Sequence, residues 1–489
     1  MSYQLSKTDY ILGLTCPRNL WLKINDPKKL RKKTLAEEFD INEGIKVGEL
    51  AKKLYTDGIN IPIEDTSDNI QKTKELLMKR KPLFEAGFEF ENYYARVDIL
   101  VPNGEGWDII EVKSSTKLKD KFLYDVSFQK FVLESNGLKI KNCFLLHLNK
   151  NYIKKGEIDI EKLYTKEDIT ADVTPFSENV KEIVKILVGM VSSEKPPMGR
   201  ILYDEKIVKA TTHNCLTDGC LELEDNNVFC LYGNKQVARE LFKNEIELIK
   251  DIPVNYELSE RQQIQKECSK TEKPYVNKSK LLEFLNLLQY PIYYLDFETF
   301  STAIPMFDGL NPHAKVPFQF SLHIIDKEGM NPKHHEFLFD GENDPREDFL
   351  QAIRKAIGIN GSILVYSKSF EEGILRDLAE YFPKHRKWIY QVINRLVDLR
   401  IPFRKFWYYN LKQQGIASIK AVFSAMTEMH YDDLEIRDGR TAHVEFLRIT
   451  CEDCCEEEIE RVRYNLLQYC KLDTLAQVKV LEKLTELVK

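Results

Sequence analysis

Two acidic side chains interrupt an otherwise apolar strand-like segment, and this feature constrains the fold of the chain most. The segment is Pro291–Glu298, in which Asp296 and Glu298 are two residues apart and share one face of a strand. Buried carboxylates so close together repel one another unless a cation neutralises them. The sequence therefore predicts a strand that ends in a metal site. The alternative is a solvated strand end.

A second pair of residues with related chemistry lies far along the chain. Tyr469 and Asp473 are four residues apart within Ile459–Leu487, a long amphipathic helix pattern, and so lie on one helix face. Phosphodiester hydrolysis by two metal ions needs a carboxylate cluster and a group that positions water. We therefore expect Asp296, Glu298 and Asp473 to converge, with Tyr469 directed at the same point.

The first part of the chain carries its own acidic pattern. Glu111 and Lys113 share a face at the end of the strand-like segment Trp107–Val112, and Asp98 lies in the preceding strand-like segment, Tyr93–Val101. A Pro-Asn-Gly turn between the segments predicts a hairpin that brings Asp98 to the same point. Two converging carboxylates bind a divalent cation, and a neighbouring lysine orients water or stabilises charge on a phosphate. The alternative is that the charges simply alternate on a solvated strand face.

The order of predicted elements indicates an α/β fold with two α/β domains. The first domain follows the order helix, hairpin, helix, strand, over Gly44–Tyr55, Tyr93–Val112, Asp125–Glu134 and Cys143–Asn149. The second adds strands at Phe318–Ile325 and Ile363–Tyr366. Between the domains, Leu231–Pro253 predicts two short helices around a turn. Such a pair is either a plain connection or a phosphate grip made of backbone amides.

The net charge and the hydropathy of the chain limit which kinds of partner it can bind. The net charge is −6, with 71 basic and 77 acidic residues, which is not typical of a protein that coats DNA. The basic stretch Asp26–Lys33 either holds phosphate or is a solvated loop. No apolar run approaches the roughly 20 residues that span a bilayer. The first residues lack a secretory signal. We expect a cytoplasmic protein with no membrane partner.

The first acidic pattern resembles that of RecB-like PD-(D/E)XK nucleases. The segments that carry the resemblance are Leu5–Leu22, Gly44-x-x-x-Gly48-x-x-Ala51, Phe84-Glu85-Ala86, Arg96-Val97-Asp98, Glu111-Val112-Lys113 and Asp125-x-x-x-Gln129. The most similar branch includes the CRISPR-adaptation exonucleases. The resemblance implies a restriction-endonuclease-like domain over residues 1–190. It also implies Asp98 and Glu111 as metal ligands, Lys113 as the catalytic lysine, Gln129 as a supporting residue and Glu85 as a third acid.

Members of that branch also hold a four-iron cluster through one early and three later cysteines. Cys16, Cys215, Cys220 and Cys230 stand at the corresponding places in this chain. Thiolates bind iron–sulfur clusters or zinc. The resemblance therefore implies a [4Fe-4S] cluster in a connecting region over residues 191–285. Zinc, or thiols that hold no metal, are the alternatives.

The C-terminal pattern resembles that of DnaQ-like 3′–5′ exonucleases of the DEDD type. Asp296 and Glu298 match the first motif, and Tyr469 with Asp473 match the third. The second motif falls at Val365–Glu371, with Glu371 where aspartate is usual. Asp398-Leu399 and Ser418–Lys420 match elements between these motifs. The resemblance implies a ribonuclease-H-like domain over residues 286–489 that uses Mg²⁺ or Mn²⁺.

Together the two resemblances cover nearly the whole chain, and the combination is similar to a bacterial family that fuses the two domains. We expect a metal-dependent nuclease, an exonuclease in particular, that acts on DNA or RNA, with DNA favoured, in repair, recombination or defence. One alternative is a nucleic-acid-binding protein in which one or both sites are inactive. Another is an iron–sulfur redox sensor built on a nuclease scaffold.

Overall fold

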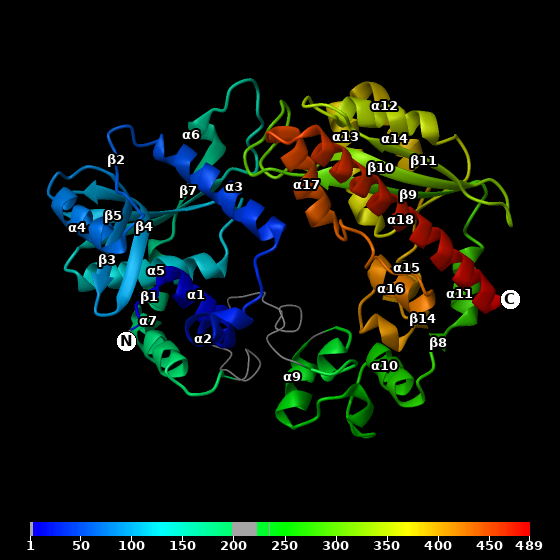
Figure 1. The fold of residues 1–489 in the computed structure, drawn as a ribbon, viewed down its shortest axis with the longest axis horizontal. Coiled ribbons are helices and arrows are strands. Elements are labelled where there is room, and N and C mark those ends of the chain that lie inside the picture. Colours follow the sequence, from blue (N-terminus) through cyan, green and yellow to red (C-terminus); the bar gives the residue numbers. More distant parts are fainter. Residues whose placement is uncertain (1–2, 198–222, 234) are drawn as a thin grey trace. The chain divides into compact units, whose positions relative to one another are not determined.

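The structure is a computed structural model that describes residues 3–197, 223–233 and 235–489. The chain forms two compact units. Unit 1 comprises Met1–Glu222 and Thr302–Ala314, and unit 2 comprises Leu223–Ser301 and Lys315–Lys489. Each unit contains a β-sheet with helices packed against it (Figure 1), so the predicted α/β class is confirmed.

Unit 1 is built on a seven-stranded sheet. The strand order is β2-β3-β4-β5-β6-β7, and β1 pairs in parallel with the start of β4. The strands are β1 (Leu5–Ser6), β2 (Ile59–Asn60), β3 (Leu83–Phe90), β4 (Tyr93–Asn103), β5 (Gly106–Lys113), β6 (Ile140–Leu148) and β7 (Tyr164–Asp168). Strands β3, β4 and β5 run antiparallel, and β5 and β6 run parallel.

Alternating side chains divide the unit 1 core between the two faces of the sheet. On β5, Ile109 packs into the cluster that includes α5 and α7, whereas Ile110 packs into the cluster that includes α3. This alternation is the period of two that a strand buried on both faces requires. The helices are α1 (Lys7–Thr15), α2 (Pro17–Asn25), α3 (Leu35–Lys52), α4 (Thr66–Leu77), α5 (Asp120–Ser135), α6 (Ile160–Leu163) and α7 (Thr170–Val191).

Unit 2 contains a five-stranded sheet in the order β11-β10-β9-β12-β13. Its strands are β9 (Ile292–Phe300), β10 (Val316–Ile325), β11 (Lys333–Leu338), β12 (Ser362–Val365) and β13 (Leu396–Asp398). The first three in that order pair antiparallel, and β9, β12 and β13 pair parallel. Strand β9, which carries Asp296 and Glu298, is therefore the central strand.

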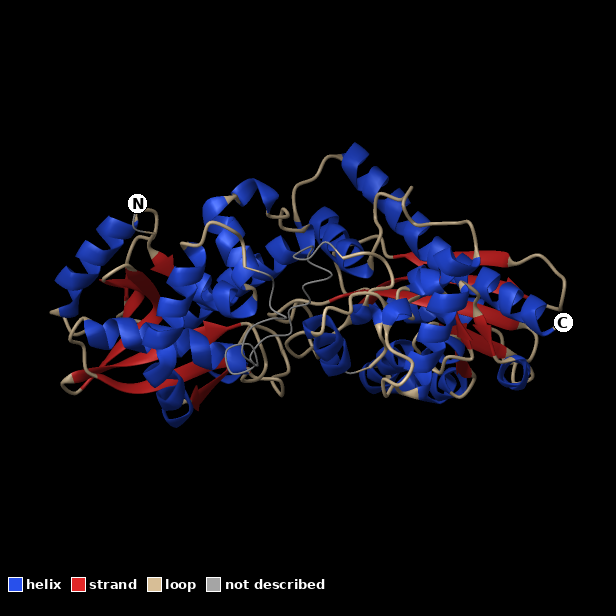
Figure 2. Ribbon diagram, turned by 90° about the horizontal axis from the view of Figure 1, so that it is seen from below, coloured by secondary structure: helices blue, strands red, loops and turns tan. Residues whose placement is uncertain are grey.

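Helices cover both faces of this sheet, as Figure 2 shows. The cluster on one face joins β9, β10 and β12 to the helices α12 (Arg346–Ala356), α13 (Lys368–Tyr381) and α14 (Arg386–Ile393). The long helix α18 (Glu456–Val488) packs against β9 and β10, where Gln477 donates to the carbonyl of Leu295. The other helices that follow β13 are α15 (Ile401–Arg404), α16 (Ile419–Met426) and α17 (Gly439–Cys451).

The described part of the expected connecting region, from residue 223 onward, packs within unit 2. Its elements are α9 (Lys235–Lys243), α10 (Glu260–Thr271), β8 (Tyr275–Val276) and α11 (Lys278–Leu285). Strand β8 pairs with β14 (Tyr408–Tyr409), and the buried Gln265 side chain donates to the Tyr409 hydroxyl. This pairing and shared burial explain why residues 223–285 do not form a separate linker. Within Leu231–Pro253, the predicted helix pair is α9 followed by a single 3₁₀ turn, Ile249–Asp251.

The loop between β9 and β10 contributes Thr302–Ala314 to unit 1. In unit 1, the amide of Ala303 donates to the Glu43 carboxylate, and Lys154 exchanges backbone hydrogen bonds with Gly309 and Leu310. No helix in the described ranges is both long and apolar enough to cross a membrane.

The buried His323 on β10 and the partly buried His334 on β11 make unit 2 sensitive to acid. His323 hydrogen-bonds to Thr474, and His334 to Ser321. Burial, followed by their mutual proximity and that of Lys471, lowers the pKa of His323 to about 4. Unfolded histidine keeps a pKa of about 6.5. Its neutral form therefore stabilises unit 2 fully above that value, and the stabilisation is lost as the pH falls toward 4.

We expect the stability of unit 2 to depend less on pH in a His323→Asn variant than in the wild type. At pH 5 the neutral His323 costs unit 2 about 2 kcal/mol relative to pH 7, because the unfolded chain binds the proton more readily. Calorimetric unfolding at pH 7, 6 and 5 measures this dependence. The matched control is His335→Asn, whose position on β11 is exposed. Identical pH dependences for wild type and His323→Asn would contradict this account.

Candidate active sites

The predicted residues of unit 1 meet where β4 and β5 separate. The backbone ladder between these strands ends at Ile99 and Ile110, and the Asp98 carboxylate then accepts from the amide of Val112 at 2.8 Å. Glu111 is fully buried, and Gln129 on α5 donates to its Oε2 at 2.6 Å. The structure thus brings Asp98, Glu111 and Gln129 to one place.

Lys113 lies in the same cluster, together with Asp125, the acid at the start of the Asp125-x-x-x-Gln129 motif. The Lys113 ammonium donates to the Glu111 carboxylate and, at 2.8 Å, to Asp125 on α5. Gln129 also donates to Asp125, at 3.0 Å. Asp125 is therefore a buried member of the cluster, although the sequence gives it no separate role.

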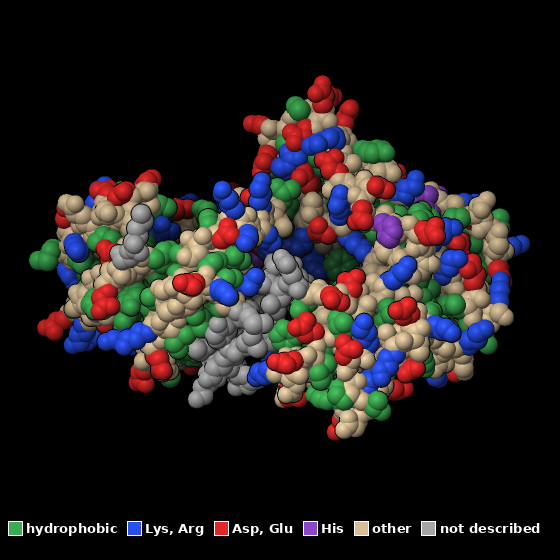
Figure 3. All heavy atoms as spheres, turned by 60° about the horizontal axis from the view of Figure 1, so that its bottom comes forward, with side chains coloured by type: hydrophobic (Ala, Val, Ile, Leu, Met, Phe, Trp, Pro, Cys, Tyr) green, Lys and Arg blue, Asp and Glu red, His purple; other side chains and the backbone are tan. Residues whose placement is uncertain are grey.

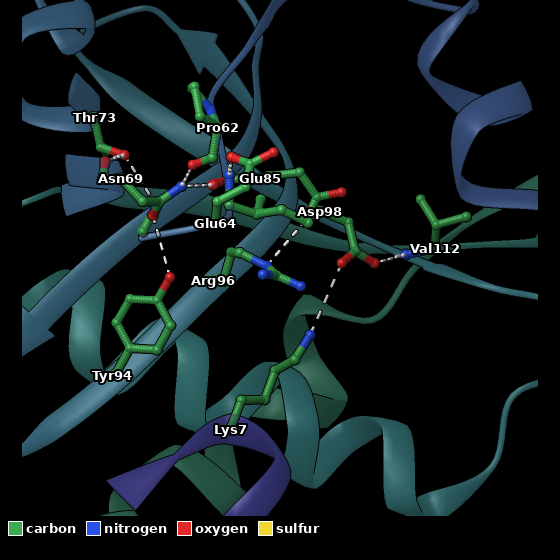
Figure 4. Close-up of polar contacts among 12 residues, drawn as sticks. Lys7, Pro62, Glu64, Asn69, Thr73, Glu85, Tyr94, Arg96, Asp98 and Val112 are labelled. Carbon is green, nitrogen blue, oxygen red and sulfur yellow. Dashed lines mark hydrogen bonds and ion pairs between the residues drawn. The ribbon is translucent and has the colours of Figure 1, made fainter. Parts of the chain in front are cut away.

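Lys7 is a member of this cluster that the sequence analysis missed. Its ammonium lies 3.1 Å from Glu111 and 3.5 Å from Asp125. It also lies 3.9 Å from Asp98, as Figure 4 shows. The side chain reaches them because β1 pairs with β4 and α1 begins directly after it. A cationic group between the two predicted ligands indicates that their oxygens favour a cation there. This donor set, all carboxylate oxygens, fits Mg²⁺ or Mn²⁺.

The pKa values of the two buried acids of the cluster, Glu111 and Asp125, are shifted in opposite directions. Burial, followed by the charges of Asp125 and Asp98, raises the pKa of Glu111 to about 7. Burial also favours the neutral form of Asp125, but the ammonium groups of Lys113 and Lys7 overcome it and lower the pKa of Asp125. The site therefore holds one strongly ionised carboxylate, and an additional cation would favour ionisation of Glu111.

These residues border a cleft of about 440 Å³. Helix α3 lines one side of the cleft with Gly44, Gly48 and Lys52, and the acids Asp98 and Glu111 line the cleft as well. Four basic and four acidic side chains line it in total: Lys7, Lys52, Arg96, Lys113, Glu49, Glu85, Asp98 and Glu111. A bound divalent cation would therefore make the cleft positive, which favours a polyanionic ligand.

Glu85 occupies the same cleft in an unusual backbone conformation. The ladder pairs Phe84 with Ile99 and Ala86 with Val97, so Glu85 lies opposite Asp98. Its φ is +59°, a region that non-glycine residues rarely adopt. Its carboxylate contacts Lys52 and Arg96, and the prediction that Glu85 is the third acid of this site stays a prediction.

The buried side chain of Asn69 holds this conformation in place. Its amide donates to the carbonyls of Pro62 and Glu85 at 2.8 and 2.9 Å, and its oxygen accepts from the Tyr94 hydroxyl (Figure 4). A Cβ on Gly87 would lie 1.8 Å from the Asn69 oxygen, so glycine at this position makes room for it.

We expect Asn69→Ala to destabilise unit 1 by about 2–4 kcal/mol, because it removes three partly buried hydrogen bonds, to two carbonyls and a hydroxyl. Calorimetry should show the unit 1 transition lowered by roughly 5–10 °C. Gln71→Ala, at an exposed position on the same helix, is the control. An unchanged transition in Asn69→Ala would show that Asn69 does not hold the Glu85 backbone.

The predicted acids of unit 2 also converge. Asp296, Glu298, Tyr469 and Asp473 line one pocket of about 210 Å³. Asp296, Glu298 and Cys470 each place a ligand atom within 4.8 Å of the others. The Asp473 carboxylate accepts from the hydroxyls of Tyr431, at 2.7 Å, and Tyr469.

Glu371 approaches this pocket from the first turn of α13. It is 1% exposed, and its Oε2 has no hydrogen-bond partner. The turn before it is strained, because Ser367 has a φ of +92° and its amide donates to the Asp398 carboxylate at 3.2 Å. Backbone strain of this kind is concentrated at functional sites. The role of Asp398 here is to hold the turn that presents Glu371.

Like charges and burial oppose ionisation throughout this pocket. Burial, followed by the charges of Asp473 and Glu298, holds the pKa of Asp296 well above its usual range. Burial raises the pKa of Asp473 to about 6 and that of Glu371 to about 8. Three acids line this pocket. A fourth, Glu371, is not among the lining residues, but its charge helps to raise the pKa of Asp296 and Glu298 and its buried Oε2 has no partner. This set of acids fits one or more bound cations.

Lys420, Tyr431 and Cys470 are further pocket residues whose roles the sequence did not assign. Lys420 lines the pocket, with its ammonium 5.0 Å from the ring centre of Tyr469 and 5.2 Å from that of Tyr431. Its charge favours the ionised forms of Asp296 and Glu298. Only Lys420 had a signal in the sequence, the Ser418–Lys420 element.

The predicted cysteine cluster is tested only in small part. Cys215 and Cys220 lie outside the described residues. Cys16 is buried in unit 1, where its sulfur caps α2 by accepting from the amide of Asn19. Cys230 lies in unit 2, where it donates to Gln414. These contacts give Cys16 and Cys230 structural roles, and the metal cluster stays a prediction.

The family model and the known proteins that this chain matches have no assigned activity. Residues 293–418 match the model of a domain of unknown function, DUF2779. The chain is 26% identical over 242 residues to an uncharacterized protein, MG366, of Mycoplasma genitalium, a match that covers 46% of this chain and 36% of that protein. It is 27% identical over 215 residues to the MG366 homolog of Mycoplasma pneumoniae, covering 38% of this chain and 31% of that protein. The matches thus span about a third of the relatives' own length.

Proposed function

We propose that the protein is a metal-dependent nuclease with one phosphodiester-hydrolysing site in each unit. The observation that carries the proposal is the convergence of Asp296, Glu298 and Asp473, with Tyr469, in one buried pocket. Such a set of carboxylates is costly to fold without a cation. It is well suited to bind two metal ions at a scissile phosphate.

The architecture of unit 2 supports the same proposal. Its strand order places three antiparallel strands beside two parallel ones, with the first strand in the centre. We infer the ribonuclease-H-like fold that the DnaQ resemblance implies. In unit 1, the hairpin β4–β5 followed by α5 and the parallel strand β6 supports the restriction-endonuclease-like fold of the RecB resemblance.

In unit 2, Asp296, Glu298, Asp473 and Glu371 are the residues that would hold Mg²⁺ or Mn²⁺. When bound, such ions lower the pKa of water and stabilise charge that develops on the phosphate. The Tyr469 hydroxyl borders the same pocket and orients the attacking water. Lys420 contributes positive charge beside the acids, which stabilises the ionised carboxylates that ligation requires.

In unit 1, Asp98 and Glu111 would hold the metal, and their oxygens already face the Lys7 ammonium. Lys113 is fixed by Glu111 and Asp125, so its ammonium is positioned to orient water or to stabilise an anionic phosphate. Gln129 fixes the Glu111 carboxylate from α5. Each of these tasks is a positioning task, which a rigid strand end performs well.

Basic side chains are interspersed with acidic ones on the face drawn in Figure 3. We therefore infer that nucleic acid is held within the clefts rather than on a broad basic surface. The test is digestion of end-labelled single- and double-stranded DNA and RNA by the full chain, with Mn²⁺ or with EDTA. We expect Mn²⁺-dependent shortening of DNA. Binding of DNA without cleavage at any metal concentration would instead favour the second candidate, a nucleic-acid clamp.

A further inference from the structure

We propose that Arg96 and Lys52 form a phosphate-binding subsite beside the unit 1 acids, and that the Glu85 carboxylate occupies this subsite until a nucleic-acid phosphate displaces it. The inference rests on the proposed nuclease function of unit 1. It gives a specific role to Glu85, which the resemblance implies only as a third acid, and it assigns two basic residues that the motif leaves without a role.

The contacts of Glu85 are those of an anion in a basic site. Its Oε2 lies 3.1 Å from Arg96 Nε, and its Oε1 lies 3.3 Å from Lys52 Nζ. Arginine and lysine bind carboxylates and phosphates through the same charge-assisted hydrogen bonds. Lys52 also pairs with Glu49, at 2.6 Å, so Arg96 is the main cation that Glu85 occupies and Lys52 is shared between two carboxylates.

This subsite lies next to the predicted metal ligands. Arg96 and Asp98 are two residues apart on β4 and share a face of the strand. Glu85 lies opposite Asp98, and all three line the same cleft. A nucleic-acid strand with its scissile phosphate at Asp98 and Glu111 would therefore place a neighbouring phosphate near Arg96.

The opposite wall leaves room for a strand. Helix α3 lines the cleft with Ile41, Gly44, Gly48 and Lys52, residues that recur every three or four positions and so share one helix face. A Cβ placed on Gly44 or Gly48 would meet no atom within 4 Å. Glycines at these two positions make the wall shallow beside Lys52, and Ile41, 44% exposed, offers apolar contact to a base or sugar.

The strained backbone explains how Glu85 is kept in the subsite. Its φ of +59° is fixed by the Asn69 hydrogen bond to its carbonyl, so the residue is held by its backbone and not by its side chain alone. Displacement then needs only a side-chain rotation, because the carboxylate is 20% exposed. A phosphodiester in its place would gain both Arg96 and Lys52.

The test is binding of a fluorescein-labelled 12-nucleotide single strand to the full chain in EDTA, carried to saturation at several salt concentrations. We expect Glu85→Gln to bind about tenfold more tightly than wild type, because Arg96 is released to the phosphate and Lys52 loses one of its two carboxylate partners. Arg96→Met should bind more weakly and should lower the salt slope by about 1. None of these substitutions touches unit 2, so any difference belongs to unit 1.

Controls separate this subsite from general charge effects and from metal ligation. Glu64→Gln removes the same charge from an exposed position near Glu85 (Figure 4) and should change affinity less than twofold. Titration with Mn²⁺ should give Glu85→Gln the wild-type metal affinity. Loss of Mn²⁺ affinity together with unchanged oligonucleotide binding would overturn the inference and make Glu85 a metal ligand. Wild-type binding with no change in Glu85→Gln or Arg96→Met would overturn it while leaving the nuclease proposal intact. Absence of oligonucleotide binding in all variants would overturn both.

Discussion

Asp296→Asn should abolish the metal-dependent cleavage carried out by unit 2 and, without metal, should make unit 2 more stable. The activity falls because a metal-binding carboxylate becomes a neutral amide, and we expect a loss of at least about 1,000-fold, the scale of a lost electrostatic stabiliser. Stability rises because the pKa of Asp296 is well above its usual range in the folded chain. A carboxyl group whose pKa is raised by folding destabilises the folded chain at neutral pH, by about 1.4 kcal/mol for each tenfold change in its acid dissociation constant, and the neutral amide avoids this cost.

Rates on an end-labelled strand and calorimetry in EDTA at pH 8 measure both effects. The transition of unit 2 should rise by roughly 2–4 °C for each 1 kcal/mol gained. Asp326→Asn is the matched control, since Asp326 lies just beyond β10 and pairs with Lys333 at the surface. It should change neither rate nor stability by a measurable amount. An Asp296→Asn protein that is less stable than wild type and equally active would show that this carboxylate is not a metal ligand.

Glu111→Gln is expected to have an effect of similar size on the activity of unit 1. Glu111 is fully buried and is contacted by Lys7, Lys113 and Gln129, so its charge organises the cluster. Glutamine preserves the shape, loses the charge, and leaves the partly buried ammonium groups of Lys7 and Lys113 less well compensated. We expect at least a 100-fold loss of cleavage by unit 1 and a weaker response of stability to Mn²⁺.

The measurement is cleavage in an Asp296→Asn background, where only unit 1 is active. Lys113→Met should lose activity to a similar extent but retain Mn²⁺ binding, because a lysine is not a ligand. Glu105→Gln, in the exposed turn between β4 and β5, is the control and should cleave at the same rate as the Asp296→Asn protein without it. Equal rates for Glu111→Gln and Glu105→Gln would exclude Glu111 from the reaction.

The sequence predicted the elements with strong periodicity well. The hairpin around Asn103, the helix over Asp125–Glu134 and the long C-terminal helix agree with β4–β5, α5 and α18. These segments have buried faces that repeat every two or about 3.6 residues, and that pattern is visible in a single chain. The acids of both sites were visible too, because charge in an apolar strand contradicts its surroundings.

Other features depend on contacts that no local pattern encodes. Lys7 reaches Glu111 only because the two-residue strand β1 pairs with β4. Tyr431 reaches Asp473 from a loop far away in the sequence. The assignment of residues 223–285 to unit 2 rests on the pairing of β8 with β14, two strands too short to show periodicity. The left-handed conformation of Glu85 has no signal, since glutamate is not typical of it.

The central claim is that both units hydrolyse phosphodiesters through their carboxylate clusters. Its most direct test is the rate of DNA shortening in Mn²⁺ for wild type, Asp296→Asn, Glu111→Gln and the double variant, all as full chains. We predict that each single variant retains the activity of the other unit and that the double variant has none. Undiminished cleavage by the double variant, with the purified protein free of contaminating nuclease, would contradict the claim.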